Sequence, residues 1–172
     1  MPINLSKYDS NYSTFTLIPD GTPVCMVMRI NRSPYGELVT ESASGAKYLK
    51  SEFIVCGGQY SNRKIYQLIG IHSPKGPKWS EMGGAFLKTL YLSAKGVNEE
   101  EPVIINDYDE LESKPFACII GISKEKDQEG NARESNTIKR ILLPMDSEYG
   151  EVMKVAKKPV AQTTGFDDDI PF

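Results

Sequence analysis

The sequence predicts a mainly β domain, a barrel of five short strands with one helix between the third and fourth strands. Three observations predict it. Three β-rich runs come first, a run with apolar residues at helical spacing follows, and two more β-rich runs close the pattern. The chain of 172 residues, 40% hydrophobic and 25% charged, has the size and composition of one globular domain with appendages.

The first three strands are predicted from β-forming runs that are bounded by turn residues. Residues 23–31 are rich in Val, Met and Ile, and residues 32–45 contain the Pro and Gly of a loop. Residues 46–58 alternate apolar with polar side chains, which indicates a strand with one buried face. Residues 64–71 follow after a short turn, so these two strands are expected to form a hairpin.

The helix is predicted over residues 79–96, after a segment of Pro and Gly. Ser80 is the expected N-cap and Gly96 the expected C-cap. Gly83 and Gly84 each cost the helix about 1 kcal/mol relative to Ala. We therefore expect them to permit close packing against the sheet.

The last two strands are predicted over residues 115–123 and 136–144, joined by a polar loop over 124–135. A short strand over 103–105 and one short amphipathic turn or helix over 145–156 are also expected. Strand, strand, strand, helix, strand, strand is the order of the OB-fold, a Greek-key barrel. A sandwich of five strands is the alternative, and the single helix in fourth place favours the barrel.

The net charge of −3 hides an uneven distribution. Asp167, Asp168 and Asp169 carry −3 by themselves, so the rest of the chain is neutral. Residues 24–97 hold ten Lys and Arg against four Glu, whereas residues 99–112 hold seven acidic and no basic residues. The chain is a mildly basic body interrupted by an acidic segment, and this pattern is a better guide to partners than the total charge. The acidic segment fits an insertion, a dimer contact or a shield equally well.

Enzyme chemistry is not expected, and neither is a cofactor or a metal. The chain has one histidine, His72, and no phosphate-binding loop, nucleophile elbow or paired-cysteine zinc motif. Cys25, Cys56 and Cys118 are far apart in apolar segments, which predicts buried free thiols in a reducing compartment. Because no apolar run could cross a bilayer and no secretion signal is visible, a cytoplasmic location is expected.

Binding of single-stranded nucleic acid fits the sequence better. Such binding needs cations for phosphates and flat rings on which bases stack. An OB-fold offers them on its second and third strands and in two of its loops. Cations and aromatic residues interleave at these places, so the expected binding residues are Arg29, Arg32, Tyr35, Tyr48, Lys50, Tyr60, Arg63, Lys64, Tyr66, Trp79, Lys124, Lys126, Arg133, Lys139 and Arg140.

The final residues, Asp-Asp-Asp-Ile-Pro-Phe, resemble the acidic tip of bacterial single-stranded DNA-binding proteins residue for residue. In that family the tip recruits replication, recombination and repair proteins. The resemblance implies that the Phe172 ring enters an apolar pocket on a partner and that Pro171 restricts the chain. The aspartates would steer the tip to basic surfaces. The residues expected to dock partners are Asp167, Asp168, Asp169, Ile170, Pro171 and Phe172.

The body resembles phage-encoded single-stranded DNA-binding proteins of the OB type, through "IPDG", "SGAKYLKSEFIV", Trp79 at the helix start, "SKPFACIIGISKEK" and "SNTIKRILLP". It lacks the N-terminal strand pattern and the Gln/Gly-rich linker of the bacterial family. The resemblance implies an N-terminal extension (1–20), a DNA-binding domain (21–150), a linker (151–166) and a docking tip (167–172).

This resemblance implies sequence-independent binding and protection of single-stranded DNA during replication, recombination or repair in a bacterial host cell. Self-association into a homo-oligomer is compatible with it. Two alternatives remain. The chain could be a decoy that occupies host proteins through its tip without binding DNA, or an RNA-binding OB-fold protein, because stacking does not distinguish the sugars.

Overall fold

The computed structural model describes residues 2–4, 16–126 and 128–156. Five long strands and the expected helix lie close to the predicted ranges. The elements, in chain order, are β1 (Thr22–Asn31), β2 (Thr40–Glu41), β3 (Lys47–Val55), β4 (Lys64–His72), α1 (Lys78–Lys95), the short 3₁₀ helix η2 (Tyr108–Leu111), β5 (Phe116–Lys126) and β6 (Ala132–Leu142). A further short helix covers residues 149–156, as the amphipathic pattern predicted.

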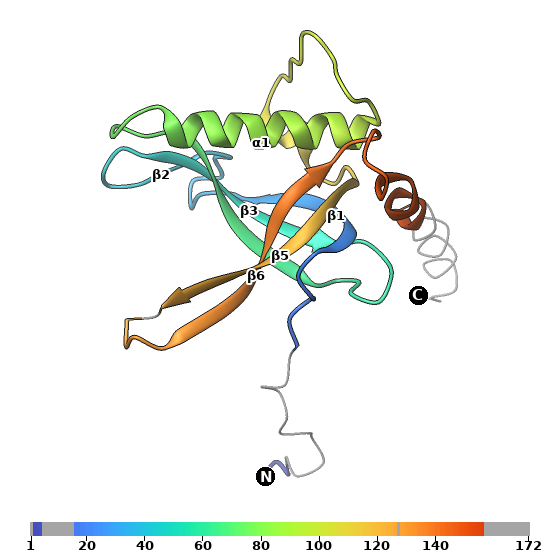
Figure 1. Ribbon diagram of the computed structural model, residues 1–172. Coiled ribbons are helices and arrows are strands. Elements are labelled where there is room, and N and C mark those ends of the chain that lie inside the picture. The colour runs from blue at the N-terminus through green and yellow to red at the C-terminus, as the bar shows by residue number, and fades with distance from the viewer. Residues whose placement is uncertain (1, 5–15, 127, 157–172) are drawn as a thin grey trace.

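In the described residues the strands form one six-stranded antiparallel sheet, which confirms the mainly β class (Figure 1). The main path runs β4–β3–β1–β5–β6, and β2 lies beside the start of β3. Cα atoms of β4 and β6 approach within 8 Å, but within the described part of the chain no hydrogen-bonded pairing joins these two strands. The sheet is therefore strongly curled and is not closed.

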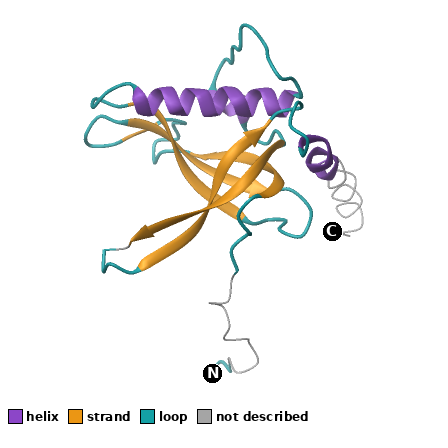
Figure 2. Cartoon of the chain, viewed as in Figure 1, coloured by secondary structure: helices purple, strands orange, loops and turns teal. Residues whose placement is uncertain are grey.

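The core lies between the concave side of the sheet and α1, which runs along one side of it (Figure 2). The rings of Phe53 and Phe86 pack edge to face at 5.7 Å, and Phe53 meets Phe116 in the same way at 6.0 Å. Phe53 comes from β3, Phe86 from α1 and Phe116 from β5. These contacts tie the helix to both halves of the sheet.

The C-terminal end of α1 agrees with the prediction, and the N-terminal end does not. Gly96 ends the helix in the left-handed conformation (φ 82°), and its N–H donates to the carbonyl groups of Leu92 and Ser93. The N-cap position is occupied by Pro77, with no side-chain cap. Ser80 instead lies within the first turn and its hydroxyl donates to the Pro77 carbonyl at 2.9 Å, so the predicted Ser80 cap is wrong.

The predicted polar loop over 124–135 is also wrong, because most of it is strand. β5 and β6 continue as a two-stranded arm that projects from the sheet (Figures 1 and 2). Polar cross-strand pairs hold the arm: Lys124 lies 3.7 Å from Glu134, and the hydroxyls of Ser123 and Ser135 are 3.1 Å apart. Since solvent reaches both faces here, no apolar alternation marks these residues as strand.

The acidic segment packs on the body through its apolar side chains. Leu111 is buried in the core, and Ile105 and Tyr108 lie against it. The Glu112 carboxylate accepts hydrogen bonds from the Ile30 N–H at 3.0 Å and from the Arg32 guanidinium at 2.9 Å. Residues 103–105 form no strand, so that prediction is wrong.

The helix over 149–156 covers the opposite face of the sheet. Its Val152 joins a smaller apolar cluster with Cys25, Ala117, Ile119 and Leu142. The Tyr149 hydroxyl donates to the Ser93 carbonyl at 2.6 Å, which links this helix to α1. No helix in the described part of the chain is long and apolar enough to cross a membrane.

Candidate nucleic-acid interface

The outer face of β1, β3 and β4 carries two rows of side chains that cross the three strands. The register places Arg29, Glu52 and Tyr66 in one row. The next row holds Asn31, Lys50 and Leu68. Tyr66 is 67% exposed and Leu68 is 53% exposed, although both lie within a strand of the sheet. An aromatic and an aliphatic side chain are therefore presented to solvent beside two cations.

A continuous groove runs from this face to the start of α1. It consists of three adjoining pockets of about 250, 150 and 440 Å³. The first two share Leu68, and the last two share Trp79 and Met82. We call it the β4–α1 groove and define it by the residues Asn31, Lys50, Tyr66, Leu68, Lys75, Lys78, Trp79 and Met82.

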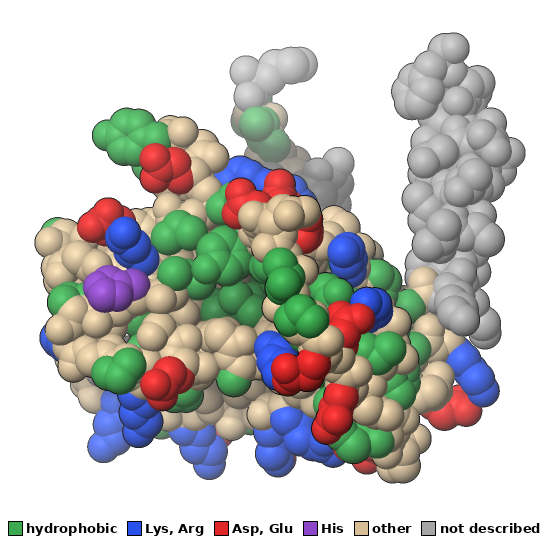
Figure 3. All heavy atoms as spheres, turned by 90° about the horizontal axis from the view of Figure 1, so that it is seen from above, with side chains coloured by type: hydrophobic (Ala, Val, Ile, Leu, Met, Phe, Trp, Pro, Cys, Tyr) green, Lys and Arg blue, Asp and Glu red, His purple; other side chains and the backbone are tan. Residues whose placement is uncertain are grey.

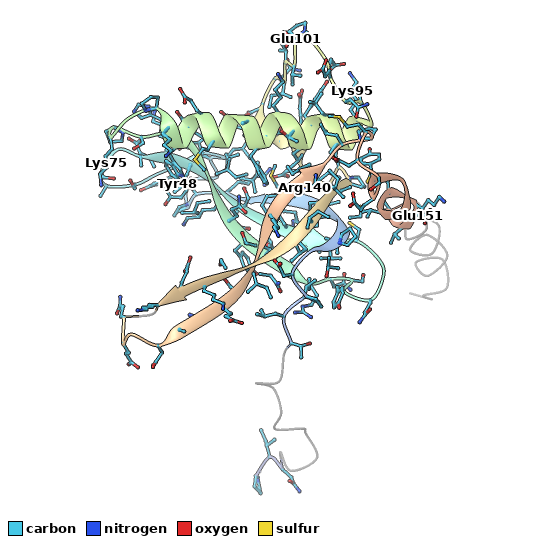
Figure 4. All side chains as sticks on the ribbon, viewed as in Figure 1. Tyr48, Lys75, Lys95, Glu101, Arg140 and Glu151 are labelled. Atoms are coloured by element: carbon cyan, nitrogen blue, oxygen red, sulfur yellow. The ribbon has the colours of Figure 1, made fainter. Side chains whose placement is uncertain are left out.

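The Trp79 ring is held in this groove by a glycine. A Cβ on Gly70 would lie 2.4 Å from the Trp79 ring, so the ring lies directly on the β4 backbone. Tyr48 of β3 lies beside it, with the two ring centroids 6.2 Å apart and tilted by 51°. Figure 4 shows Tyr48 below the first turns of α1 and Lys75 in the loop that precedes the helix, at the same end of the molecule. The aromatic side chains are thus fixed before any ligand arrives.

The lysines of the groove, and Arg29 beside it, form no ion pair with an acidic side chain of the described residues. These lysines are Lys50, Lys75 and Lys78. Eight other basic side chains of the described residues lie in ion pairs, for example Lys139–Asp20 at 3.7 Å. An unpaired ammonium or guanidinium group remains available to a phosphate.

The predicted binding residues fall into three groups. The structure brings Arg29, Tyr48, Lys50, Tyr66 and Trp79 together at or beside the groove. Lys64 is close to them but is paired with Glu52 at 2.8 Å, and this hydrogen bond raises the pKa of the Lys64 ammonium.

A second group of predicted residues instead makes contacts within the protein. Tyr60 packs against the core. Arg63 donates to the Thr16 carbonyl. Arg32 forms the ion pair with Glu112, and Arg140 lies 3.4 Å from Asp146. Lys139, in its pair with Asp20, also belongs here.

The third group lies on exposed segments outside the groove. Tyr35 is 90% exposed in the loop between β1 and β2. Lys124, Lys126 and Arg133 are exposed on the arm. They were expected in a loop and lie on β5 and β6 instead.

Sequence reasoning missed Asn31, Leu68, Lys75, Lys78 and Met82. One signal could have revealed Leu68, because the alternation in residues 64–72 places it on the same face as Lys64 and Tyr66. Lys75 and Lys78 stand in a segment whose Pro and Gly suggested only a break between elements. Nothing in the helical pattern distinguishes the 62% exposed Met82 from a core residue.

A separate apolar pocket of about 270 Å³ lies between α1 and the acidic segment. Its walls include Ile71, Leu87, Tyr91, Ile105 and Tyr108. Figure 3, viewed from the α1 side, shows hydrophobic side chains gathered around a hollow on this face. The one lysine in its lining, Lys88, lies 3.9 Å from Glu101, so the pocket lacks the free cations of the β4–α1 groove.

The predicted docking residues Asp167 to Phe172 lie outside the described residues, as does most of the expected linker. Among the described residues, no group of three or more His, Cys, Asp or Glu side chains is placed to hold a metal ion. No protein-family model matches the chain, and a search of curated proteins finds no similar sequence.

Proposed function

We propose that the chain binds single-stranded DNA without sequence preference and holds it along the β4–α1 groove. One observation carries the proposal: exposed aromatic and aliphatic side chains line a continuous groove whose lysines have no acidic partner in the described residues. No chemistry is performed on the strand. The protein would act as a coat that protects DNA during replication, recombination or repair.

The groove has the two components that such binding needs. Tyr66 and Trp79 offer ring faces, and stacking of a base on an aromatic side chain is worth about 1–3 kcal/mol. Every base has such a face, so stacking does not select a sequence. Arg29, Lys50, Lys75 and Lys78 would follow the phosphates, which makes the affinity depend on salt.

The fold supports the same proposal. We infer that the domain is an OB-fold, because the path β4–β3–β1–β5–β6 with a helix between β4 and β5 is the strand order of that barrel. OB-folds bind nucleic acid on their second and third strands and in the loops that join strands 1–2 and 4–5. The corresponding strands here are β3 and β4, which carry the groove. The 32–46 loop and the arm, which correspond to the two loops, lie outside it (Figure 1).

The acidic tip would then connect the coated strand to other proteins. This part of the proposal rests on the resemblance of Asp167–Phe172 to the tip of bacterial single-stranded DNA-binding proteins. Partners would be replication, recombination and repair proteins that have an apolar pocket with a basic rim. A synthetic peptide with this sequence tests the tip separately from the groove. It should bind such enzymes, and it should lose that binding when its Phe is replaced by Ala.

A titration of labelled oligonucleotides tests the main proposal. Fluorescence anisotropy with oligo-dT, the same length of duplex DNA and a matched RNA, each at two salt concentrations, should show tight binding to oligo-dT and weak binding to duplex. The affinity for oligo-dT should fall as salt rises. Equal affinity for single strands and duplex would contradict the proposal, and tighter binding to RNA would favour the RNA-binding alternative. Absence of all nucleic-acid binding, together with retained binding of the tip to host enzymes, would favour the decoy.

A further inference from the structure

Two cysteines far apart in the sequence meet at one end of the sheet. Cys25 belongs to β1, and Cys56 directly follows β3. The register pairs Met26 with Val55, so Cys25 and Cys56 are the next opposite pair. The Cys56 N–H donates to the Cys25 carbonyl at 2.8 Å, which extends the antiparallel pairing to these two residues.

This placement suits a disulfide bond. Directly opposite residues of an antiparallel pair have Cα atoms about 4.5–5.5 Å apart, and Cα atoms of disulfides are usually about 4.4–6.8 Å apart. Directly opposite residues of an antiparallel pair point to the same side of a sheet, so both thiols lie on one side, and the Cys56 thiol donates to the Ile54 carbonyl at 3.8 Å. Both cysteines are free thiols in this structure.

The environments of the two thiols are unequal. The pKa of the Cys56 thiol is lowered, because a hydrogen bond from the neighbouring Cys25 thiol would stabilise its thiolate. The pKa of Cys25 is raised by its hydrogen bond to Cys56, by burial and by the neighbouring charge. Cys56 is half-buried and Cys25 is buried. Both line a pocket of about 210 Å³ beside the helix over 149–156, which would admit a small oxidant.

The third cysteine provides an internal comparison. Cys118 is buried in the core and no solvent reaches it. Burial raises the pKa of its thiol, so it stays protonated. A thiolate is the form that reacts with oxidants, and therefore Cys118 should be inert under conditions that modify an accessible thiolate.

We propose that Cys25 and Cys56 form a redox modification site, at which a hydroperoxide oxidises Cys56 and Cys25 then closes a reversible disulfide. The site is independent of the β4–α1 groove. It requires hydrogen peroxide or an organic hydroperoxide as the oxidant and a thiol reductant to reverse the modification.

The reaction is balanced in two steps. The Cys56 thiolate attacks the terminal peroxide oxygen and the O–O bond breaks, leaving a sulfenic acid on Cys56. The departing hydroxide, or alkoxide from an organic hydroperoxide, takes a proton to become water or an alcohol. The Cys25 sulfur then attacks the Cys56 sulfur, and the sulfenic hydroxyl leaves with the Cys25 proton as water. The two sulfurs lose two electrons in total, and the peroxide gains them.

Intact-mass and peptide analysis of the full chain test this proposal. Hydrogen peroxide should remove the mass of two hydrogens from the monomer, and dithiothreitol should restore it. Trypsin separates the cysteines into the peptides Tyr8–Arg29, Ser51–Arg63 and Gly96–Lys124, because it does not cut between Lys114 and Pro115. The expected product is a covalent link between the first two peptides, with Gly96–Lys124 unmodified.

Three results would overturn the proposal: a link to the Cys118 peptide, a link between two chains, or stable oxygen addition at Cys56 with no link. Cys25→Ser should leave Cys56 as a sulfenic acid that dimedone traps, whereas Cys118→Ala should form the link as the unaltered protein does. If a variant fails to fold, the peptide map of the unaltered chain still tests the proposal, because the Cys118 peptide in the same map is the unmodified control.

The pH dependence gives a second readout. Alkylation of Cys56 by iodoacetamide should reach half its maximal rate at a pH below the ordinary cysteine pKa of about 8.5, because the lowered pKa of Cys56 keeps more of it as thiolate. Cys25→Ala, which removes the donor, should shift that midpoint upward. A midpoint that Cys25→Ala leaves unchanged would mean that the two thiols do not interact.

Discussion

Gly83 of α1 lies so close to Gly70 of β4 that a Cβ on Gly83 would stand 2.0 Å from the Gly70 carbonyl oxygen. On its outer face, Gly70 also supports the Trp79 ring. One close contact between helix and strand therefore determines both how α1 sits on the sheet and where the aromatic ring of the groove is held. Any side chain at either glycine would separate the two elements.

The first prediction follows from this contact. Gly83→Ala should destabilise the fold by about 1–3 kcal/mol, the usual cost of forcing atoms into a packed site, because the obstacle is backbone and cannot rotate away. Urea denaturation measures the change. Gly84→Ala is the matched control: no atom lies within 4 Å of its Cβ position. It should stabilise the helix by about 0.5–1 kcal/mol, and an equal effect of both substitutions would contradict the close contact.

The second prediction concerns stacking in the groove. Tyr66→Ala should weaken binding of oligo-dT by about 1–3 kcal/mol and leave the fold intact, because the Tyr66 side chain is 67% exposed. Tyr35→Ala, at a 90% exposed tyrosine outside the groove, is the control and should change the affinity less. The single tryptophan, Trp79, provides the readout, since stacking on it should quench its fluorescence. If Tyr66→Ala shows the same affinity for oligo-dT and the same Trp79 quenching as the unaltered protein, the bound DNA does not pass over Tyr66.

The third prediction concerns the unpaired lysines. Lys50→Ala and Lys78→Ala should each lower the affinity for oligo-dT and reduce the slope of log affinity against log salt by about 0.7, the value for one phosphate contact on a single strand. Lys139→Ala is the control, since Lys139 already faces Asp20 at 3.7 Å. If Lys139→Ala changed the slope as much as Lys50→Ala, the distribution of ion pairs would not determine the DNA path.

The fourth prediction concerns the acidic tip. Removal of Ile170–Phe172 should leave the affinity for oligo-dT intact and abolish binding to partner enzymes. Replacement of the three aspartates by Asn should raise the DNA affinity at low salt if the tip competes with DNA for the lysines, and this gain should disappear at high salt. A large loss of DNA affinity in either variant would make the tip part of the DNA site.

Predictions from the sequence succeeded where local periodicity carries the information. Strands β1, β3 and β4 and the helix α1 lie within a few residues of their predicted ranges, and Gly96 ends α1 as expected. The arm was missed because its side chains are polar on both faces. The Ser80 cap was misplaced because α1 begins at Lys78.

By itself the sequence determined the mainly β class, the order of its elements, the aromatic residues Tyr48, Tyr66 and Trp79, and an excess of basic residues before the acidic segment. Only the tertiary structure decided which cations are free, because an ion pair such as Arg32–Glu112 joins residues 80 positions apart. It also decided that Leu68 and Met82 line a groove and that Cys25 meets Cys56. Such contacts depend on how strands pair and where a helix packs, which local sequence patterns do not encode.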